Sequence, residues 1–168
     1  MLDAKQLIAI ARQLVGKKRK GAPNQTSLRR AISTAYYALF HAMLRAGADV
    51  LVGKTKRKTR RYELIYRAFE HAKMLRGCED VDKPILGAKT QKALGVPSVS
   101  QDIRDIASTF VALQQHRHWA DYSPQGKIAR AEAEDLVDQA ELAMSKLNEC
   151  DASELSDFLV FLLVSSRA

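Results

Sequence analysis

Apolar residues recur every three or four positions along most of the chain, which is the pattern of helices that bury one face. The first stretch of this kind predicts a helix over Asp3–Val15, with Asp3 as its N-cap. The second predicts a helix that begins at Thr26 or Ser27, either of which has the side chain of an N-cap, and that ends at Gly47. No stretch shows the two-residue alternation that is typical of a half-buried strand.

The helical pattern continues over Tyr62–Leu75, and Gly77 is the expected end of that helix. Residues 77–99 contain three glycines and two prolines. We expect them to form a long connection, with room for one short helix at Gly87–Leu94. Long irregular connections in a compact domain are often functional.

The last part of the chain predicts three more helices. Ser100 is the expected N-cap of the first of them, which continues to Arg117. Ser123-Pro124 breaks the pattern, and Pro124 is well placed to begin the next helix, whose apolar positions lie in 129–147.

A final helix is expected after Asp151 or Ser153, and its end, Phe158–Val164, is apolar on every side. Such a helix must be covered on more than one face, so we expect it to take part in oligomerisation or to be wrapped into the core. Together the elements predict one all-α domain over residues 1–168, folded as an up-and-down bundle of five or six helices.

Composition limits the class of protein. The chain has 168 residues, 46% of them hydrophobic, which suits one globular domain with a buried core. No apolar run approaches the roughly 20 residues that cross a bilayer, so no membrane association is expected. Two cysteines, Cys78 and Cys150, are too few for a disulfide framework, and we expect a cytoplasmic location.

The net charge of +8 hides an asymmetry between the two halves of the chain. Residues 1–76 contain 18 Lys and Arg against four acids, whereas residues 77–168 contain nine against 15. Either the oppositely charged halves fold against each other or assemble head to tail, or the basic half faces an anion, most often a nucleic acid.

Two basic runs mark the N-terminal half, Lys17–Lys20 and the segment 53–61. Within Lys54–Arg61 six of eight residues are basic, which favours contact with a phosphate backbone over a solvated loop. Two arginines also lie in the first turn of the second helix, where the helix dipole disfavours positive charge. The candidate nucleic-acid-binding residues are therefore Arg29, Arg30, Lys54, Lys56, Arg57, Lys58, Arg60 and Arg61.

Two motifs stand out within the predicted helices: Arg30–His41, RAISTAYYALFH, and Arg117–Tyr122, RHWADY. In this order, in an all-helical chain of this length, they resemble the HEPN family, although the first is one residue longer between Ala31 and Ala35 than the family pattern. HEPN domains are small and helical, and many cleave RNA or accompany nucleotidyltransferases. The resemblance implies a four-helix core and a homodimer formed through the faces that carry the motifs.

In the RNA-cleaving HEPN members, an Arg that binds the scissile phosphate is followed after four to six residues by a His that transfers protons, without a metal. Counted from Arg117, those positions begin at Tyr122 and hold no histidine. The candidate catalytic residues are therefore Arg117, His116, His118 and Tyr122, and enzymatic activity stays open. His116 and His118 are two residues apart and face different sides of a helix, so no metal or other cofactor is expected.

The remaining motif residues have structural alternatives. Tyr36 falls on the apolar stripe and is expected in the core, whereas Tyr37 stays open between a packing role and base stacking. We expect a salt bridge between Arg30 and Asp121. Arg117 either binds phosphate or pairs with Asp121, with the structural role slightly favoured.

Three functions remain open on this basis. The first is an RNA-associated protein of a toxin–antitoxin or defence system, a context that the HEPN resemblance alone implies. The second is a metal-independent ribonuclease with a rearranged Arg/His site. The third is a non-catalytic interaction module that partners a nucleotidyltransferase or an antitoxin.

Overall fold

A computed structural model describes residues 2–16, 24–123 and 125–164 of the chain. These residues form eight α-helices and one short 3-10 helix, with no strand among them, so the all-α class is confirmed. The number of helices exceeds the five or six expected. The helices are α1 (Ala4–Val15), α2 (Gln25–Val52), η1 (Lys54–Lys56), α3 (Arg60–Ala68), α4 (His71–Val81), α5 (Ala88–Leu94), α6 (Gln101–Tyr122), α7 (Arg130–Glu149) and α8 (Ala152–Val164).

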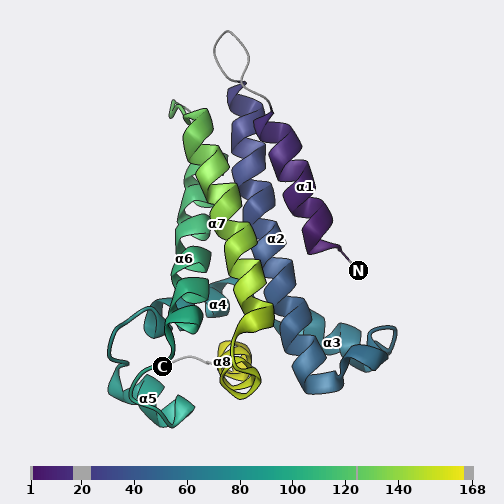
Figure 1. Ribbon diagram of the computed structural model, residues 1–168, viewed down its shortest axis with the longest axis vertical. Coiled ribbons are helices and arrows are strands. Elements are labelled where there is room, and N and C mark those ends of the chain that lie inside the picture. Colours follow the sequence, from purple (N-terminus) through teal and green to yellow (C-terminus); the bar gives the residue numbers. More distant parts are fainter. Residues whose placement is uncertain (1, 17–23, 124, 165–168) are drawn as a thin grey trace.

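Four helices, α1, α2, α6 and α7, stand side by side as the upright part of the molecule, and the other helices, α3, α4, α5 and α8, gather at its lower end (Figure 1). Helix α2 is central, because α1, α6 and α7 all pack against it. Its apolar stripe is fully buried, as the helical periodicity predicts. The stripe consists of Leu28, Ile32, Tyr36, Leu39 and Met43.

Helix α2 is longer than the sequence suggests, and the expected stop at Gly47 was wrong. Gly47 lies inside the helix, where the ring of Phe69 packs so closely that a side chain at position 47 would collide with it. The helix ends instead at Gly53, whose φ of 105° is a conformation that glycine adopts readily. At the other end the N-cap is Asn24, which accepts a hydrogen bond from the Ser27 amide at 3.1 Å, rather than Thr26 or Ser27.

The single helix expected over Tyr62–Leu75 was also wrong, because the chain breaks at Phe69 and Glu70. Phe69 takes an extended conformation (φ −73°, ψ 123°), and its side chain becomes buried against α2. A new helix, α4, starts at His71 and continues through the buried Gly77 to Val81. The connection expected over 77–99 is therefore shorter, and it includes the predicted short helix as α5.

Two predicted N-caps, Asp3 and Ser100, are confirmed, and of the alternatives Asp151 and Ser153 the N-cap is Asp151. Asp3 accepts a hydrogen bond from the Lys5 amide, Ser100 accepts one from the Ile103 amide, and Asp151 accepts bonds from the first turn of α8. The start predicted for the next-to-last helix lies at Pro124, outside the described residues, whereas α7 itself begins at Arg130.

The apolar end of the chain is wrapped into the core. Helix α8 packs against α4, α2 and α5, and its Leu155, Phe158, Leu159, Phe161 and Leu162 are buried. Most of its apolar surface is therefore covered within one copy of the chain. Among the described helices, none combines the length and the apolar character that crossing a bilayer requires.

The two oppositely charged halves meet along α1 and α7. Arg12 of the basic half forms ion pairs with Asp138 and Glu141 of α7. These acids therefore offset part of the basic charge inside the fold. Both partners are exposed, so the pairs contribute little to stability.

Candidate functional site

The two sequence motifs come together where α2 packs against α6. The guanidinium carbon of Arg117 lies 5.2 Å from the ring centroid of Tyr36 and 5.5 Å from that of Tyr37, which is within cation–π distance. Tyr36 is fully buried, as expected, whereas Tyr37 remains 37% exposed. Arg117 therefore lies at a surface that has one buried and one exposed aromatic ring.

A carboxylate fixes the position of Arg117. Its Nε donates to Oδ2 of Asp121 at 3.2 Å, and Oδ1 of the same carboxylate accepts a hydrogen bond from the buried Ser33 hydroxyl at 2.7 Å. The salt bridge expected between Arg30 and Asp121 is absent from the described residues. Arg30 is exposed there, and no described acid lies within ion-pair distance of it.

A histidine from a third helix joins this group. Nδ1 of His71, the first residue of α4, lies 2.5 Å from the Tyr36 hydroxyl, and its ring stacks on Phe40 at 3.8 Å. Burial lowers the pKa of His71, and the positive charges of Arg117 and His41 lower it further. The ring is therefore neutral at neutral pH, the state in which a histidine accepts a proton.

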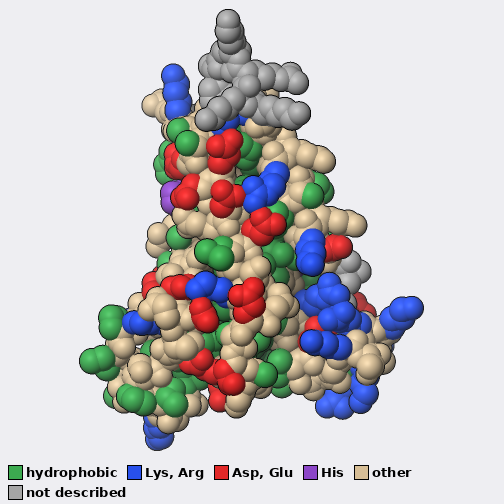
Figure 2. All heavy atoms as spheres, in the orientation of Figure 1, with side chains coloured by type: hydrophobic (Ala, Val, Ile, Leu, Met, Phe, Trp, Pro, Cys, Tyr) green, Lys and Arg blue, Asp and Glu red, His purple; other side chains and the backbone are tan. Residues whose placement is uncertain are grey.

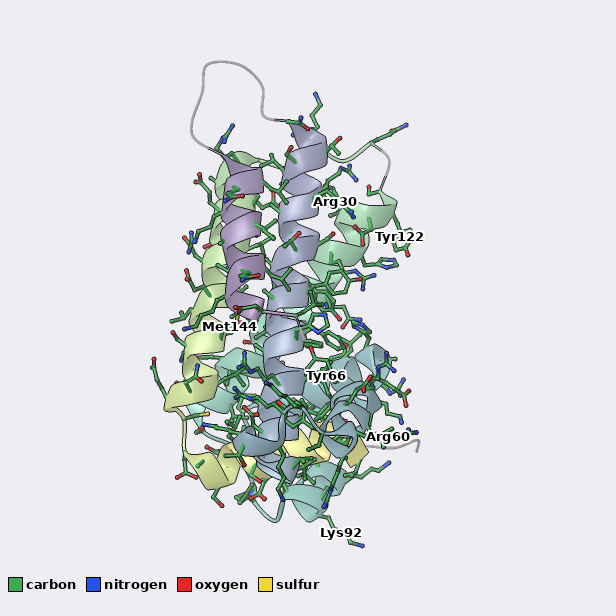
Figure 3. The ribbon with its side chains drawn as sticks, turned by 90° about the vertical axis from the view of Figure 1, so that its right-hand side faces the viewer. Arg30, Arg60, Tyr66, Lys92, Tyr122 and Met144 are labelled. Atoms are coloured by element: carbon green, nitrogen blue, oxygen red, sulfur yellow. The ribbon has the colours of Figure 1, made fainter. Side chains whose placement is uncertain are left out.

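A second Tyr–His pair lies beside the first. Nδ1 of His41 is 2.7 Å from the Tyr66 hydroxyl of α3, and the two rings stack. Burial lowers the pKa of His41 and raises that of Tyr66. Six side chains from four helices thus lie together, and we call them the Arg117 cluster: Tyr36, Tyr37, His41, Tyr66, His71 and Arg117. Tyr66 is labelled near the middle of the molecule in Figure 3.

The Arg117 cluster has the groups that phosphate chemistry requires. Asp121 pairs with the Nε of Arg117, and no described carboxylate pairs with its terminal nitrogens, although Arg117 also interacts with the Tyr36 hydroxyl. An anion can therefore still reach the guanidinium. In His41 and His71, Nδ1 is hydrogen-bonded to a tyrosine hydroxyl, and no described residue forms a hydrogen bond with Nε2 of either ring. The arrangement can bind a phosphate group and, beside it, accept or donate a proton.

The histidines chosen from the sequence do not join the Arg117 cluster. His116 turns toward α7, where its Nδ1 is 3.7 Å from Glu132. His118 packs against the ring of Tyr122, which is 69% exposed. Among the described contacts, neither histidine touches the rings of Tyr36 and Tyr37 that lie against Arg117.

Arg29 is used inside the fold. It donates to the carbonyl oxygens of Ala120 and Gly126, both at 2.6 Å, and its guanidinium carbon lies 5.5 Å from the ring centroid of Trp119. These bonds tie the end of α6 and the following loop to α2. Arg29 therefore has a structural role that the sequence did not indicate.

The basic segment 53–61 forms η1 and the turn into α3. Lys and Arg side chains gather over the end of α2, η1 and α3 in Figure 2. One of them is not free, because Arg57 pairs with Asp49, an acid eight residues earlier in the chain. The other five are exposed: Lys54, Lys56, Lys58, Arg60 and Arg61. The other basic run, Lys17–Lys20, lies outside the described residues.

Within the described part of the chain, no three His, Cys, Asp or Glu residues are placed so as to hold a metal ion. Cys78 is buried and Cys150 is half-buried, and both are free thiols.

Comparison with known proteins gave no relative: no protein-family model, no curated protein and no solved structure matches the chain.

Sequence reasoning missed His41, Tyr66 and His71. His41 follows Tyr37 by four residues on the same helix, so the helical repeat alone places the two side chains on one face. The sequence contains no such signal for His71. Its position depends on the break of the helix at Phe69, and the apolar pattern of the sequence continues through Phe69 as if there were no break.

Proposed function

We propose that the chain is an RNA-associated protein and that Arg117 binds a phosphate of the RNA. The observation that carries the proposal is the position of Arg117, oriented by Asp121 over Tyr36 and Tyr37. An arginine fixed by a second residue presents its remaining donors in a planar fork that matches phosphate geometry. The exposed ring of Tyr37 offers a face on which a base can stack.

Charge along the same side of the molecule supports a longer contact. Arg30 and Tyr122 lie in the upper half of Figure 3, Tyr66 lies near its middle and Arg60 in its lower half, all beside α2. A single RNA strand that runs along α2 past Arg117 would meet the exposed Arg30 at one end and the exposed Arg60 at the other. Such backbone contacts weaken as the salt concentration rises.

The test is the affinity of the purified protein for fluorescently labelled single-stranded RNA, measured by anisotropy at two salt concentrations. Arg117→Ala is expected to weaken binding about tenfold or more, since a charge-assisted bond to phosphate is worth about 1.5–3 kcal/mol. Arg12→Gln is the matched control, because it removes one charge from the far side of the fold at α1. Equal losses in both variants, or no salt-sensitive binding at all, contradict the proposal.

A second candidate function is a metal-independent ribonuclease, and the Tyr36–His71 pair beside Arg117 favours it. In this reaction Nε2 of His71 takes the proton of a ribose 2′-hydroxyl, and the 2′-oxygen then attacks the phosphorus that Arg117 holds. The bond from phosphorus to the 5′-oxygen breaks and that oxygen takes a proton from water, while His71 later releases its own proton to the solvent. The products are a 2′,3′-cyclic phosphate and a 5′-hydroxyl.

The candidate histidines make cleavage testable. RNA incubated with the protein in the presence of a chelator is expected to gain 2′,3′-cyclic phosphate ends. His71→Gln is expected to abolish these ends while His116→Gln retains them, because His116 faces α7. Cleavage that depends on His116 instead would refute the role of His71. If the protein binds RNA but does not cleave it, the ribonuclease proposal is wrong and only the RNA-binding proposal remains.

The remaining parts of the proposal come from the HEPN resemblance. They are a cytoplasmic homodimer, a toxin–antitoxin or defence context, and a nucleotidyltransferase or antitoxin as partner. Light scattering at several protein concentrations tests the dimer, and a monomer throughout would contradict it.

A further inference from the structure

A groove lies on another side of α2, away from the Arg117 cluster. It has a volume of about 670 Å³ and is bounded by the start of α1, the second half of α2, η1, the end of α7 and the start of α8. It exists because α1 has 12 residues and α2 has 28, so α1 covers only the first part of α2 (Figure 1). The groove continues the line of α1 along α2.

The floor of the groove is apolar, and on α2 it is made of small residues. Ala42 and Ala46 lie one turn apart on α2, and Met144 and Leu147 of α7 and Leu155 of α8 complete it. Small side chains on one helix face let another helix approach closely. The stretch of α2 from Ala42 to Val52 offers room for about three turns of helix, at about 1.5 Å per residue.

The two acids of the groove are already engaged. Asp3 caps α1 by accepting from the Lys5 amide at 2.9 Å. Asp49 accepts hydrogen bonds from Arg57 and, at 2.8 Å, from the Tyr62 hydroxyl. Burial acts to raise the pKa of Asp49, but these bonds together with the positive charges of Arg57 and Arg45 outweigh it and keep the pKa below its usual value. Asp49 is therefore a charged carboxylate whose charge is balanced by Arg57.

Four cations line the groove, and among the described residues only Arg57 has an ion-pair partner, which is Asp49. The other three are Lys5, Arg45 and Lys54, and the described chain provides no ion pair for any of them. Arg45 is half-buried, and its charge helps to lower the pKa of Asp49 without forming an ion pair with that carboxylate. A half-buried guanidinium without a direct partner is costly. The start of α1, which has no acid in its first turn, adds the positive end of a helix dipole.

We propose that this groove docks an acidic amphipathic helix of a partner protein. Its apolar face covers Ala42, Ala46 and Leu147, and its Glu or Asp side chains meet Lys5, Arg45 and Lys54. The carboxyl end of the docked helix lies toward the start of α1, since two helices in line are favoured head to tail. An apolar floor does not suit the solvated backbone of RNA, so this surface is distinct from the RNA contact proposed above.

The probe is a fluorescently labelled synthetic helical peptide of 16 residues, with Leu and Ala on one face and Glu on the other. We expect saturable binding to the full-length protein and no comparable binding of a scrambled peptide of equal composition. Ala46→Glu is expected to weaken binding more than tenfold by filling the floor with a like charge. A scrambled peptide that binds equally well overturns the proposal.

Charge variants separate docking from loss of folding. Lys5→Glu places an acid in the first turn of α1, where it favours the helix, and is nevertheless expected to weaken peptide binding several-fold. Arg45→Gln is expected to do the same, whereas Lys92→Glu on α5, the matched control, leaves binding unchanged. Equal losses in Lys5→Glu and Lys92→Glu overturn the proposal.

Two other occupants have distinct signatures, and either would overturn it. If a second copy fills the groove, light scattering shows a dimer without peptide that Ala46→Glu dissociates. If RNA fills it, single-stranded RNA displaces the peptide from wild-type protein. Arg117 lies outside the groove, so the Arg117→Ala variant is expected to bind the peptide normally even where it loses RNA binding. A failure of the RNA proposal is thereby distinguished from a failure of the docking proposal.

Discussion

At the residue scale, the pairing of buried hydroxyls with histidine rings explains how polar groups are accommodated in the Arg117 cluster. Tyr36 is fully buried, and a buried hydroxyl without a partner is costly. The 2.5 Å contact with His71 meets that requirement. Burial raises the pKa of Tyr36, so its hydroxyl keeps its proton and the pair remains neutral.

Removal of the Tyr36 hydroxyl tests this pair. Tyr36→Phe leaves Nδ1 of His71 without its partner and is expected to lower the free energy of unfolding by about 1 kcal/mol. Urea denaturation measures the change. Tyr122→Phe is the control, because Tyr122 is exposed and its loss of a hydroxyl should be nearly neutral. Equal effects in the two variants would contradict the account.

The lowered pKa of His71 predicts a dependence of stability on pH. In the unfolded chain the histidine titrates near its usual value of 6.5, whereas in the fold its pKa is lower. As the pH falls below about 6.5, the unfolded chain binds the proton first, so the free energy of unfolding falls. Measured between pH 7.5 and 5.5, this decrease should be smaller in His71→Gln than in wild type. An equal decrease in both would show that His71 does not have a lowered pKa.

At the element scale, one glycine determines how α2 meets the segment that follows it. Gly47 has no side chain, so the ring of Phe69 packs directly on the helix, and Phe69 is the residue that directly follows α3. The same contact directs the chain into α4 and brings His71 to Tyr36. The glycine thus contributes to the Arg117 cluster without touching it.

A methyl group at this position tests the contact. In Gly47→Ala the new Cβ would lie 2.3 Å from the ring of Phe69, so the ring must move. Although alanine favours helix, we expect a net loss of about 2 kcal/mol in the free energy of unfolding. Gly87→Ala, where no atom lies within 4 Å of the new Cβ and φ is −63°, should change the free energy of unfolding by less than about 1 kcal/mol. An unchanged or raised stability in Gly47→Ala would contradict the packing.

The elements show which features a sequence can predict. The N-caps Asp3, Ser100 and Asp151 follow from local hydrogen bonds, and they were predicted. The end of α2 was not, because Gly47 resembles a C-cap in sequence but is held in the helix by a residue 22 positions later. The break at Phe69 is likewise a tertiary effect, and with it the position of His71.

At the scale of the whole molecule, the two motifs meet because α2 packs against α6, and this juxtaposition follows from the predicted bundle. The pairing of Arg117 with Asp121, one turn later on the same helix, was among the expected alternatives and is confirmed. The bridge expected between Arg30 and Asp121 does not form, and the second oxygen of that carboxylate accepts a hydrogen bond from Ser33 instead. Charge is arranged on the same scale, with acids of α7 paired to α1 and exposed cations left on η1 and α3.

The central claim is that RNA passes over Arg117 and Tyr37, and photo-crosslinking tests it most directly. Single-stranded RNA that contains 4-thiouridine is bound to the protein, irradiated and digested, and the crosslinked residue is identified by mass spectrometry. The account predicts a crosslink at Tyr37, which Arg117→Ala strongly reduces and Arg12→Gln does not. Crosslinks confined to other surfaces, or unaffected by Arg117→Ala, would contradict it.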